Sequence, residues 1–186
     1  KAGTAAALTQ DYLLDCTQSG FGITPIIGVD WKLGKLNLAA KYEFRTKINL
    51  ENESKNSANV DAMMPAYADG AKVRSDIPAI LTLGAEVEAL KNLRVAAGFH
   101  YYWDKDAKGT PINEGDNTWE ANFGVEGDVT NKLTLSFGLQ TTNYGFEDAD
   151  MKDTNFNINS NALLFGGAYK FNEHFKLNVG YMHSFY

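Results

Sequence analysis

The chain has 186 residues, enough for one sizeable domain, and its 17 basic and 23 acidic residues give a formal net charge of −6. This acidic balance argues against a nucleic-acid partner, which would require a basic surface. The single cysteine, Cys16, excludes an internal disulfide, and no run of apolar residues is long enough for a membrane-spanning helix. A membrane-spanning β-strand needs only about ten residues of alternating pattern, so a β-barrel stays open as a fold class.

The first twenty residues differ from the rest of the chain. The stretch 1–15 is rich in Ala and Leu and predicts a short helix. We therefore expect 1–20 to be a loop or helical segment that precedes the first strand, and 21–186 to form one β-structure. Nothing in the sequence indicates a linker or a second domain.

From residue 21 onward, apolar and polar residues alternate with a period of two. In 35–52, for example, Leu38, Tyr42 and Phe44 fall on one face, opposite Lys41 and Glu43. Such alternation predicts strands with one apolar and one polar face. We expect about eight antiparallel strands, roughly eleven to fifteen residues long. They are predicted at 21–33, 35–52, 77–89, 93–103, 118–129, 133–141, 162–171 and 176–186.

The connections alternate between short and long. Short polar turns follow the first strand of each pair, and long polar loops are predicted at about 50–76, 104–117 and 146–160. This arrangement predicts an up-and-down meander of four hairpins. The acidic stretch 146–153 has oxygen ligands for a cation but no fixed ligand pattern, so we expect a solvated loop there.

Two architectures share this alternation: a soluble, lipocalin-like barrel with the apolar face inside, and a membrane barrel with the apolar face outside. The long strands, the short-and-long asymmetry of the connections and the position of the aromatic residues favour the membrane barrel. Aromatic residues on the apolar face gather at both strand ends: Trp31, Phe171 and Phe175 near the tight turns, and Tyr101, Trp103 and Trp119 near the long loops.

Glycine recurs on the polar face at nearly one distance from each tight turn. The set is Gly28, Gly84, Gly98, Gly124, Gly138, Gly166 and Gly180, with Ala39 in the equivalent place on the remaining strand. Glycine in a strand marks a bend or a close approach by another group. This ring of glycines either relieves curvature of the barrel wall or makes room for a plug or an apolar ligand.

The stretches at 20–52 and 76–107 resemble FadL/TodX-type outer-membrane transporters of long-chain fatty acids and aromatic hydrocarbons, especially Bacteroidetes versions often labelled hemin receptors. Pro78 and Gly84, followed by a hairpin, resemble that family's pattern. The resemblance implies a fourteen-stranded barrel in the outer membrane of a Gram-negative bacterium, in contact with lipid, with an N-terminal hatch inside it. We expect the chain to be a C-terminal-half portion without that hatch. The alternative is a small eight-stranded barrel with a structural or adhesive role.

Catalytic chemistry is not indicated, because His100, His174 and His183 are scattered and have no nucleophile beside them. No pair of His or Cys has metal-ligand spacing, and no cofactor is expected. The resemblance implies that basic lumen residues hold a fatty-acid carboxylate. By the period of two, Arg45 and Lys47 point into the lumen near the outer mouth. Together with His100 and Tyr102 on a neighbouring strand, they are the candidate ligand-binding residues. The alternative is that these lumen charges are paired with Glu43, Glu86 and Glu120.

Overall fold

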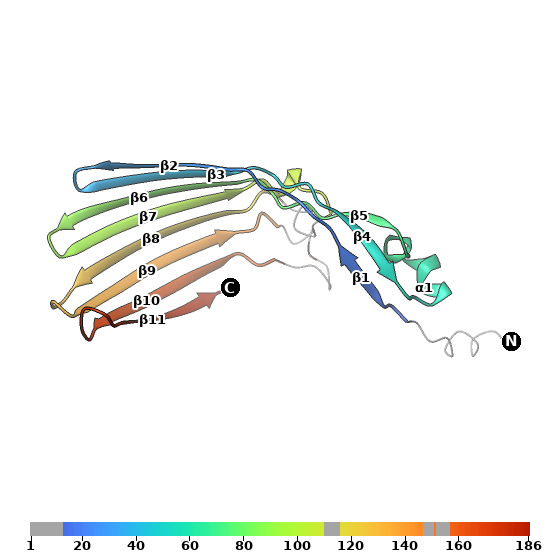
Figure 1. The fold of residues 1–186 in the computed structure, drawn as a ribbon. Coiled ribbons are helices and arrows are strands. Elements are labelled where there is room, and N and C mark those ends of the chain that lie inside the picture. The colour runs from blue at the N-terminus through green and yellow to red at the C-terminus, as the bar shows by residue number, and fades with distance from the viewer. Residues whose placement is uncertain (1–12, 110–115, 147–150, 152–156) are drawn as a thin grey trace.

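The computed structural model describes residues 13–109, 116–146, 151 and 157–186. Its main feature is one eight-stranded antiparallel sheet with the strand order β11-β10-β9-β8-β7-β6-β3-β2 (Figure 1). The strands are β2 (Ile26–Leu33), β3 (Leu36–Glu43), β6 (Ile80–Leu90), β7 (Leu93–Tyr102), β8 (Trp119–Asp128), β9 (Leu133–Asn143), β10 (Ser160–Lys170) and β11 (Lys176–Phe185). Each strand pairs with its neighbour in the sheet, which confirms the predicted all-β meander of four hairpins.

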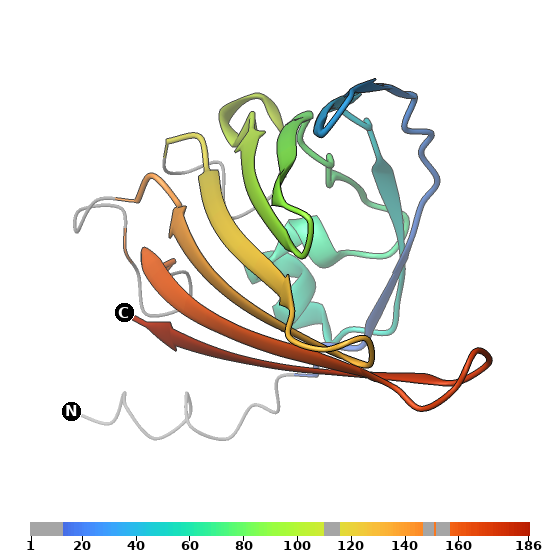
Figure 2. The same cartoon turned by 90° about the vertical axis from the view of Figure 1, so that its left-hand side faces the viewer.

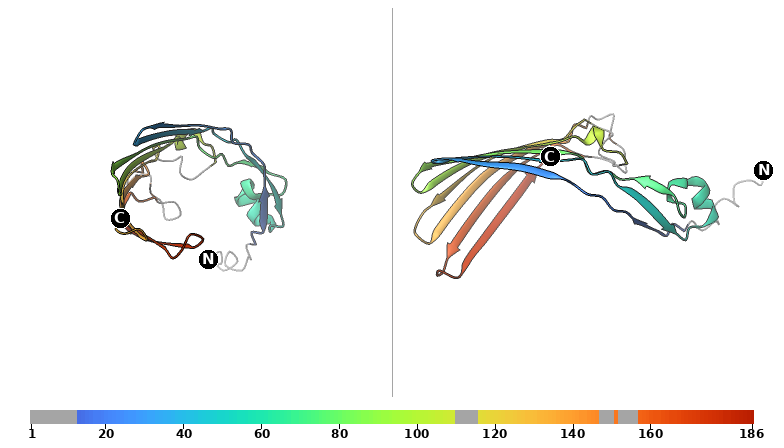
Figure 3. Two further views of the ribbon diagram at one scale, coloured as in Figure 1. Left: turned by 60° about the vertical axis from the view of Figure 1, so that its left-hand side comes forward. Right: turned by 45° about the horizontal axis from the view of Figure 1, so that its top comes forward.

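The sheet curves in one direction but does not close on itself. Figures 2 and 3 show the strands following part of a barrel wall, with β2 at one edge and β11 at the other. Among the described residues, these two edge strands do not pair with each other. A tight turn joins the two strands of each hairpin, and these turns lie at one end of the wall. Gly34 adopts a φ of 61° in the turn between β2 and β3. An L-residue rarely adopts that conformation, which accounts for glycine at this turn.

Several strands are shorter than the predicted eleven to fifteen residues. β2 and β3 differ most, with 8 residues each against the predicted segments 21–33 and 35–52, while the other six strands contain 10 or 11. For β3 the difference has a structural cause, because the alternating pattern of 35–52 continues past the main sheet into a second one. The length that remains still suits a strand that crosses a bilayer at a tilt, for which about nine to eleven residues suffice.

The second sheet contains β1 (Cys16–Ser19), β4 (Asn49–Ser54) and β5 (Lys72–Arg74), in the order β1-β4-β5. Between β4 and β5 the chain forms the helix α1 (Ala58–Met63) and the short 3-10 helix η2 (Pro65–Tyr67). The predicted polar loop at 50–76 is therefore wrong: it is a folded extension of the wall. Part of the predicted loop or helix at 1–20 is strand β1, and residues 1–12 lie outside the described residues.

One ladder connects the two sheets. The register that pairs Leu36 with Val87 in β3 and β6 continues through the bridge between Thr46 and Ile77, and on to Glu51 and Lys72 in β4 and β5. The prediction of one long alternating segment at 35–52 thus corresponds to two strands that share one register along β5 and β6.

On its other side, the same segment contains one extra residue. Glu43 pairs with Ile26, and Glu51 pairs with Ser19. Seven residues, 44–50, thus lie opposite six, 20–25. Such an insertion is a β-bulge, and it moves the side chains that follow to the opposite face.

The exposure of the side chains follows this reversal. Before the bulge, Tyr42 and Phe44 lie on the outer, apolar face, where Phe44 is 41% exposed. After the bulge, Thr46 and Asn52 are buried, and Asn52 donates hydrogen bonds to the carbonyls of Ala66 in η2 and of Ala68 just after it. The even-numbered side chains have changed from the outer face to the covered inner face.

Asp76 connects several segments at the end of the wall opposite the tight turns, which is called the rim below. Its side chain is fully buried and accepts bonds of 2.7 to 2.9 Å from the Arg74 guanidinium. It also accepts the backbone N–H of Ile48 and of Lys108, each at 3.2 Å. Burial alone would raise the pKa of this carboxyl, but these hydrogen bonds favour the charged form and hold its pKa below the usual 3.8. Three segments of the rim therefore meet at one charged group.

No helix among the described residues is long and apolar enough to cross a membrane.

Candidate functional site

The glycines of the inner face meet in pairs across the hairpins. Gly84 is directly opposite Gly98, Gly124 opposite Gly138, and Gly166 opposite Gly180. From one hairpin to the next, the pairs move by two residues toward the tight turns, because Gly98 faces Asn122 and Gly138 faces Leu164. Strands in a barrel are tilted, so a regular shift of this kind keeps the pairs at similar height on the wall.

Neighbouring side chains cover some of these glycines and leave others open. A Cβ atom on Gly98 would lie 2.7 Å from the Asn122 amide, and one on Gly166 would collide with the Ser136 hydroxyl. At Gly124 and Gly180 the nearest atoms would be backbone carbonyl oxygens at 3.6 and 3.9 Å, which is ordinary contact. The wall thus keeps open surface at Gly84, Gly124 and Gly180, while polar side chains cover Gly98 and Gly166.

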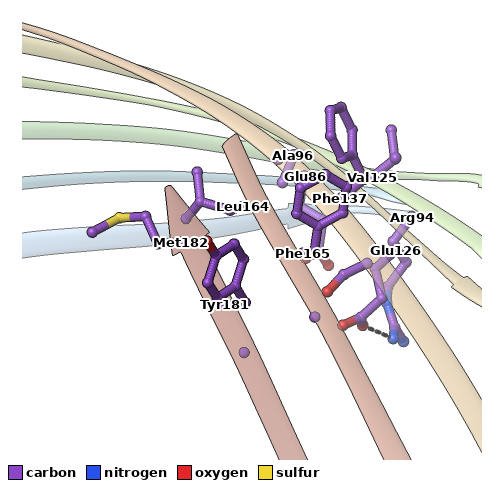
Figure 4. A pocket seen from close by; sticks show the side chains of 15 residues that line it. Glu86, Arg94, Ala96, Val125, Glu126, Phe137, Leu164, Phe165, Tyr181 and Met182 are labelled. Atoms are coloured by element: carbon purple, nitrogen blue, oxygen red, sulfur yellow. Dashed lines mark hydrogen bonds and ion pairs between the residues drawn. The ribbon is translucent and has the colours of Figure 1, made fainter. Parts of the chain in front are cut away.

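A groove of about 550 Å³ follows the open glycines (Figure 4). It is called the glycine groove below. Its backbone floor includes Gly124, Gly138, Gly166 and Gly180, and its inner-face side chains are Glu86, Arg94, Ala96, Glu126, Ser136, Leu164 and Met182. Small-molecule sites in proteins commonly measure about 300–1,000 Å³, so the groove has a suitable size for a small ligand.

The two ends of the glycine groove differ in polarity. Arg94 of β7 forms an ion pair with Glu126 of β8, near the tight-turn end, and Glu86 lies on the same side. Both members of the pair are about two-fifths exposed, so solvent screens their attraction and they contribute little stability. Leu164 of β10 and Met182 of β11 line the other end with apolar surface. The groove can therefore accept an apolar molecule at the Leu164 and Met182 end, while the end with the Arg94–Glu126 pair stays hydrated.

A hydrogen-bonded cluster around Glu120 occupies the inner face near the long-loop end. The Glu120 carboxylate accepts the Tyr102 hydroxyl at 2.9 Å and the Thr142 hydroxyl at 3.1 Å, and Nδ1 of His100 lies 3.3 Å away. Gln140 adds a longer contact of 3.5 Å. We name this set the Glu120 cluster. His100 and Tyr102 are thus brought together on the inner face, and both are engaged by a carboxylate of the wall.

Arg45 and Lys47 do not join His100 and Tyr102. They line a groove with Tyr42, Phe44 and Trp103, which belong to the outer face. The prediction that both point into the lumen is therefore wrong, and the bulge within 44–50 is the physical reason. A period-two count carried through one extra residue assigns every later side chain to the wrong face.

The part of the chain that the structure describes bears on two expectations from the sequence, one for metal ligands and one for a histidine beside a nucleophile. No three His, Cys, Asp or Glu side chains converge there as a metal site would require. His100 is hydrogen-bonded to Glu120, but no serine or cysteine nucleophile contacts it among those residues. Most of the acidic stretch 146–153 lies outside the described residues.

Two features of the site were missed in the sequence. Glu120 is one of several acidic residues on the predicted polar face, and nothing in the alternation marks it as the centre of the polar cluster. Leu164 and Met182 fall on the polar face by count, so they break the alternation. Apolar side chains at expected polar positions were the signal that could have located the apolar end of the glycine groove.

No protein-family model matches the sequence, and no curated protein is similar enough to count as a match. Solved structures do match. A FadL homologue from Pseudomonas aeruginosa superimposes with a TM-score of 0.65 at 17% identity, over 86% of this chain and 42% of its own. The CymD monoaromatic hydrocarbon channel gives 0.59 at 14% identity, over 89% and 47%. A deletion mutant of the TodX monoaromatic hydrocarbon channel gives 0.57 at 18%, over 88% and 44%.

At these identities the likeness concerns the fold. The chain spans less than half of the length of each of these barrels, while most of its own length is matched. This agrees with the open sheet, whose two edges remain unpaired with each other in the described part. The chain therefore has the fold of a portion of a FadL-type barrel.

Proposed function

We propose that the chain forms part of an outer-membrane channel for hydrophobic small molecules, such as long-chain fatty acids or monoaromatic hydrocarbons. The glycine groove is the observation that supports this most directly. It combines missing side chains at Gly124 and Gly180 with apolar surface from Leu164 and Met182 on the inner face of the wall. Transfer of an apolar molecule from water to such a surface is favourable by roughly 25 cal/mol per Å² buried.

The outer face supports a membrane location in a Gram-negative outer membrane. Large apolar side chains such as Phe123, Leu139 and Phe165 are 44 to 50% exposed there, which would be unfavourable in water over so large an area. Tight turns at one end and folded extensions at the other are the asymmetry of outer-membrane barrels. In this proposal the tight turns face the periplasm, and a hatch segment outside this chain faces the glycine groove.

A structural or adhesive barrel of only eight strands is the competing function. It would require β2 and β11 to pair and close the wall, whereas the described sheet is open between them. Its inner face would also need side chains that fill the lumen. The glycine groove leaves that space open, so the channel fits the geometry better.

Filling the glycine groove is the direct test. In the variant Gly124→Leu/Gly180→Leu, the new Cβ atoms make only ordinary contacts, so the strands should still fold. The control is Ala97→Leu, which adds bulk on the outer face only, because Ala97 pairs with the outward-facing Phe123. We expect hydrocarbon or fatty-acid uptake by cells to fall several-fold in the groove variant and to stay unchanged in the control. Equal uptake by all three proteins would contradict the channel.

A further inference from the structure

Two grooves on the outer face meet at one residue, Tyr42. The first has a volume of about 260 Å³ and runs down the wall between β2, β3 and β6, lined by Ile27, Val29, Ala40, Tyr42 and Leu81. Ala40 is the small side chain in this set and pairs with the larger Val29. A depression therefore passes over Ala40, between larger apolar side chains.

The second groove, of about 550 Å³, continues beyond Tyr42 to the rim of the wall. Arg45 and Lys47 line it from the bulged segment, and Trp103 lines it from the end of β7. The Arg45 guanidinium donates a hydrogen bond to the backbone carbonyl of Asp106, which directs the cation over this groove. Within the described residues, neither Arg45 nor Lys47 forms an ion pair.

The height of these cations on the wall follows from the aromatic residues beside them. The Tyr42 ring packs edge-on against Phe44 at 4.8 Å and against Trp103 at 5.6 Å, and Tyr101 packs against Trp103 at 4.9 Å. Tyr and Trp gather where a membrane protein crosses the headgroup region. Arg45 lines the same groove as Tyr42, Phe44 and Trp103, so its cation lies beside aromatic residues of the kind that mark the headgroup region.

We propose that the two grooves together bind one phosphate-bearing anionic lipid on the outer wall. Arg45 and Lys47 hold the phosphate, and an acyl chain lies in the groove over Ala40. Guanidinium and ammonium groups are the usual partners of phosphate. The site is separate from the inner face, so it does not depend on the channel function.

The apolar groove argues for a lipid rather than a soluble anion. A soluble anion would use only Arg45 and Lys47, and it would gain nothing from a depression that begins at Tyr42 and leads toward the middle of the wall. Asp106 is the acidic residue that lines the cationic groove, and its carboxylate offsets part of the positive charge. Its removal should therefore strengthen the binding of an anionic lipid.

Native mass spectrometry of the purified protein can measure the first bound lipid, with phosphatidic acid compared with phosphatidylcholine of the same acyl chains. We expect Arg45→Gln/Lys47→Gln to weaken phosphatidic acid at least about tenfold, since each cation near the membrane surface contributes roughly 1 kcal/mol. The matched control Lys170→Gln/Lys176→Gln removes two cations at the tight-turn end and should have no effect. Phosphatidylcholine binding should be the same in all three proteins.

Two more variants test each groove separately. Ala40→Leu fills the apolar groove and should weaken phosphatidic acid several-fold, whereas Asp106→Asn should tighten it. Inorganic phosphate should not displace the lipid. If Arg45→Gln/Lys47→Gln and Lys170→Gln/Lys176→Gln weaken phosphatidic acid binding equally, the proposal is overturned, because general charge attraction then explains the binding. Unchanged binding in Ala40→Leu, or displacement by inorganic phosphate, would overturn the assignment to a lipid.

Discussion

Exchange of Phe123 for arginine tests which face of the sheet meets lipid. Phe123 lies on the outer face of β8, where it pairs with Leu139 of β9 and with Ala97 of β7. Its neighbour Asn122 lies on the inner face, with its amide over Gly98. The two residues are adjacent in sequence and have opposite predicted environments, so arginine at each position gives a matched comparison.

The depth of Phe123 sets the expected cost. Phe123 is four residues from Trp119, the aromatic residue at the rim end of β8. Four residues span about 13 Å along a strand, or roughly 9 Å in depth at a tilt near 45°. The apolar band of such barrels is about 25 Å tall, and a lipid-facing arginine costs about 2–4 kcal/mol at its middle and about 0–1 near its edges. We therefore expect a loss of roughly 2–3 kcal/mol for Phe123→Arg and less than about 1 for Asn122→Arg.

Urea titration of the protein folded into lipid vesicles measures both free energies of unfolding. Phe123→Ala should accompany them, because it separates loss of the ring from burial of the charge. Similar costs for the two arginine variants would refute this assignment of faces, and a larger cost for Asn122→Arg would mean that the inner face meets lipid.

Further predictions concern the rim and the glycine pairs. Asp76→Asn should cost about 1–3 kcal/mol, since it weakens the hydrogen bonds of several donors, although Arg74 is partly exposed to solvent. In the unmodified protein, the carboxylate's pKa is below its usual value, so its contribution to stability is full above about pH 4 and falls as the pH drops through that lowered pKa, as urea titration at several pH values would reveal. Gly84→Ala should raise the free energy of unfolding by about 0.5–1 kcal/mol, whereas Gly98→Ala should raise it less because Asn122 must move. If the long connections face outward, protease added to intact cells should cut within 104–117. Cutting only after the outer membrane is permeabilised would contradict that orientation.

The meander was predictable because each strand's evidence is local. Alternation with a period of two marks the strands, and polar residues mark the turns, so the hairpins of β6 to β11 follow from the sequence alone. The rim was not predictable in this way. The stretch 50–76 is polar, as a loop would be, yet β4 and β5 form there because they extend a ladder that begins at Leu36 and Val87. Pairing partners supplied by the tertiary fold outweighed the local composition.

The candidate site was predictable only in part for a related reason. Glycine recurrence located the groove, because a missing side chain is visible in any sequence. The convergence of Tyr102 and Thr142 on Glu120 depends on the register of β7, β8 and β9. That register is set by pairing between strands and cannot be read from any one strand's sequence. Arg45 and Lys47 were assigned to the wrong face because a single extra residue within 44–50 leaves no mark in the alternation.

That extra residue has a consequence for how the wall meets its surroundings. Without it, the alternation would direct Arg45 and Lys47 into the lumen and would direct Thr46 toward lipid. With it, Thr46 contacts Thr24 in a buried position, and both cations lie beside the aromatic ring of Tyr42 at the edge of the apolar band. Long basic side chains stabilise that edge because their stems cover apolar surface while their charges reach water or phosphate.

The bulge therefore marks the height at which the wall changes from a lipid-facing barrel to a water-exposed extension, and it removes two positive charges from the lumen. In the proposed channel, a carboxylate would then meet Glu120 and its hydrogen-bonded partners on the inner face, so we expect uncharged hydrocarbons to enter more readily than fatty acids, which uptake assays with both ligands would test.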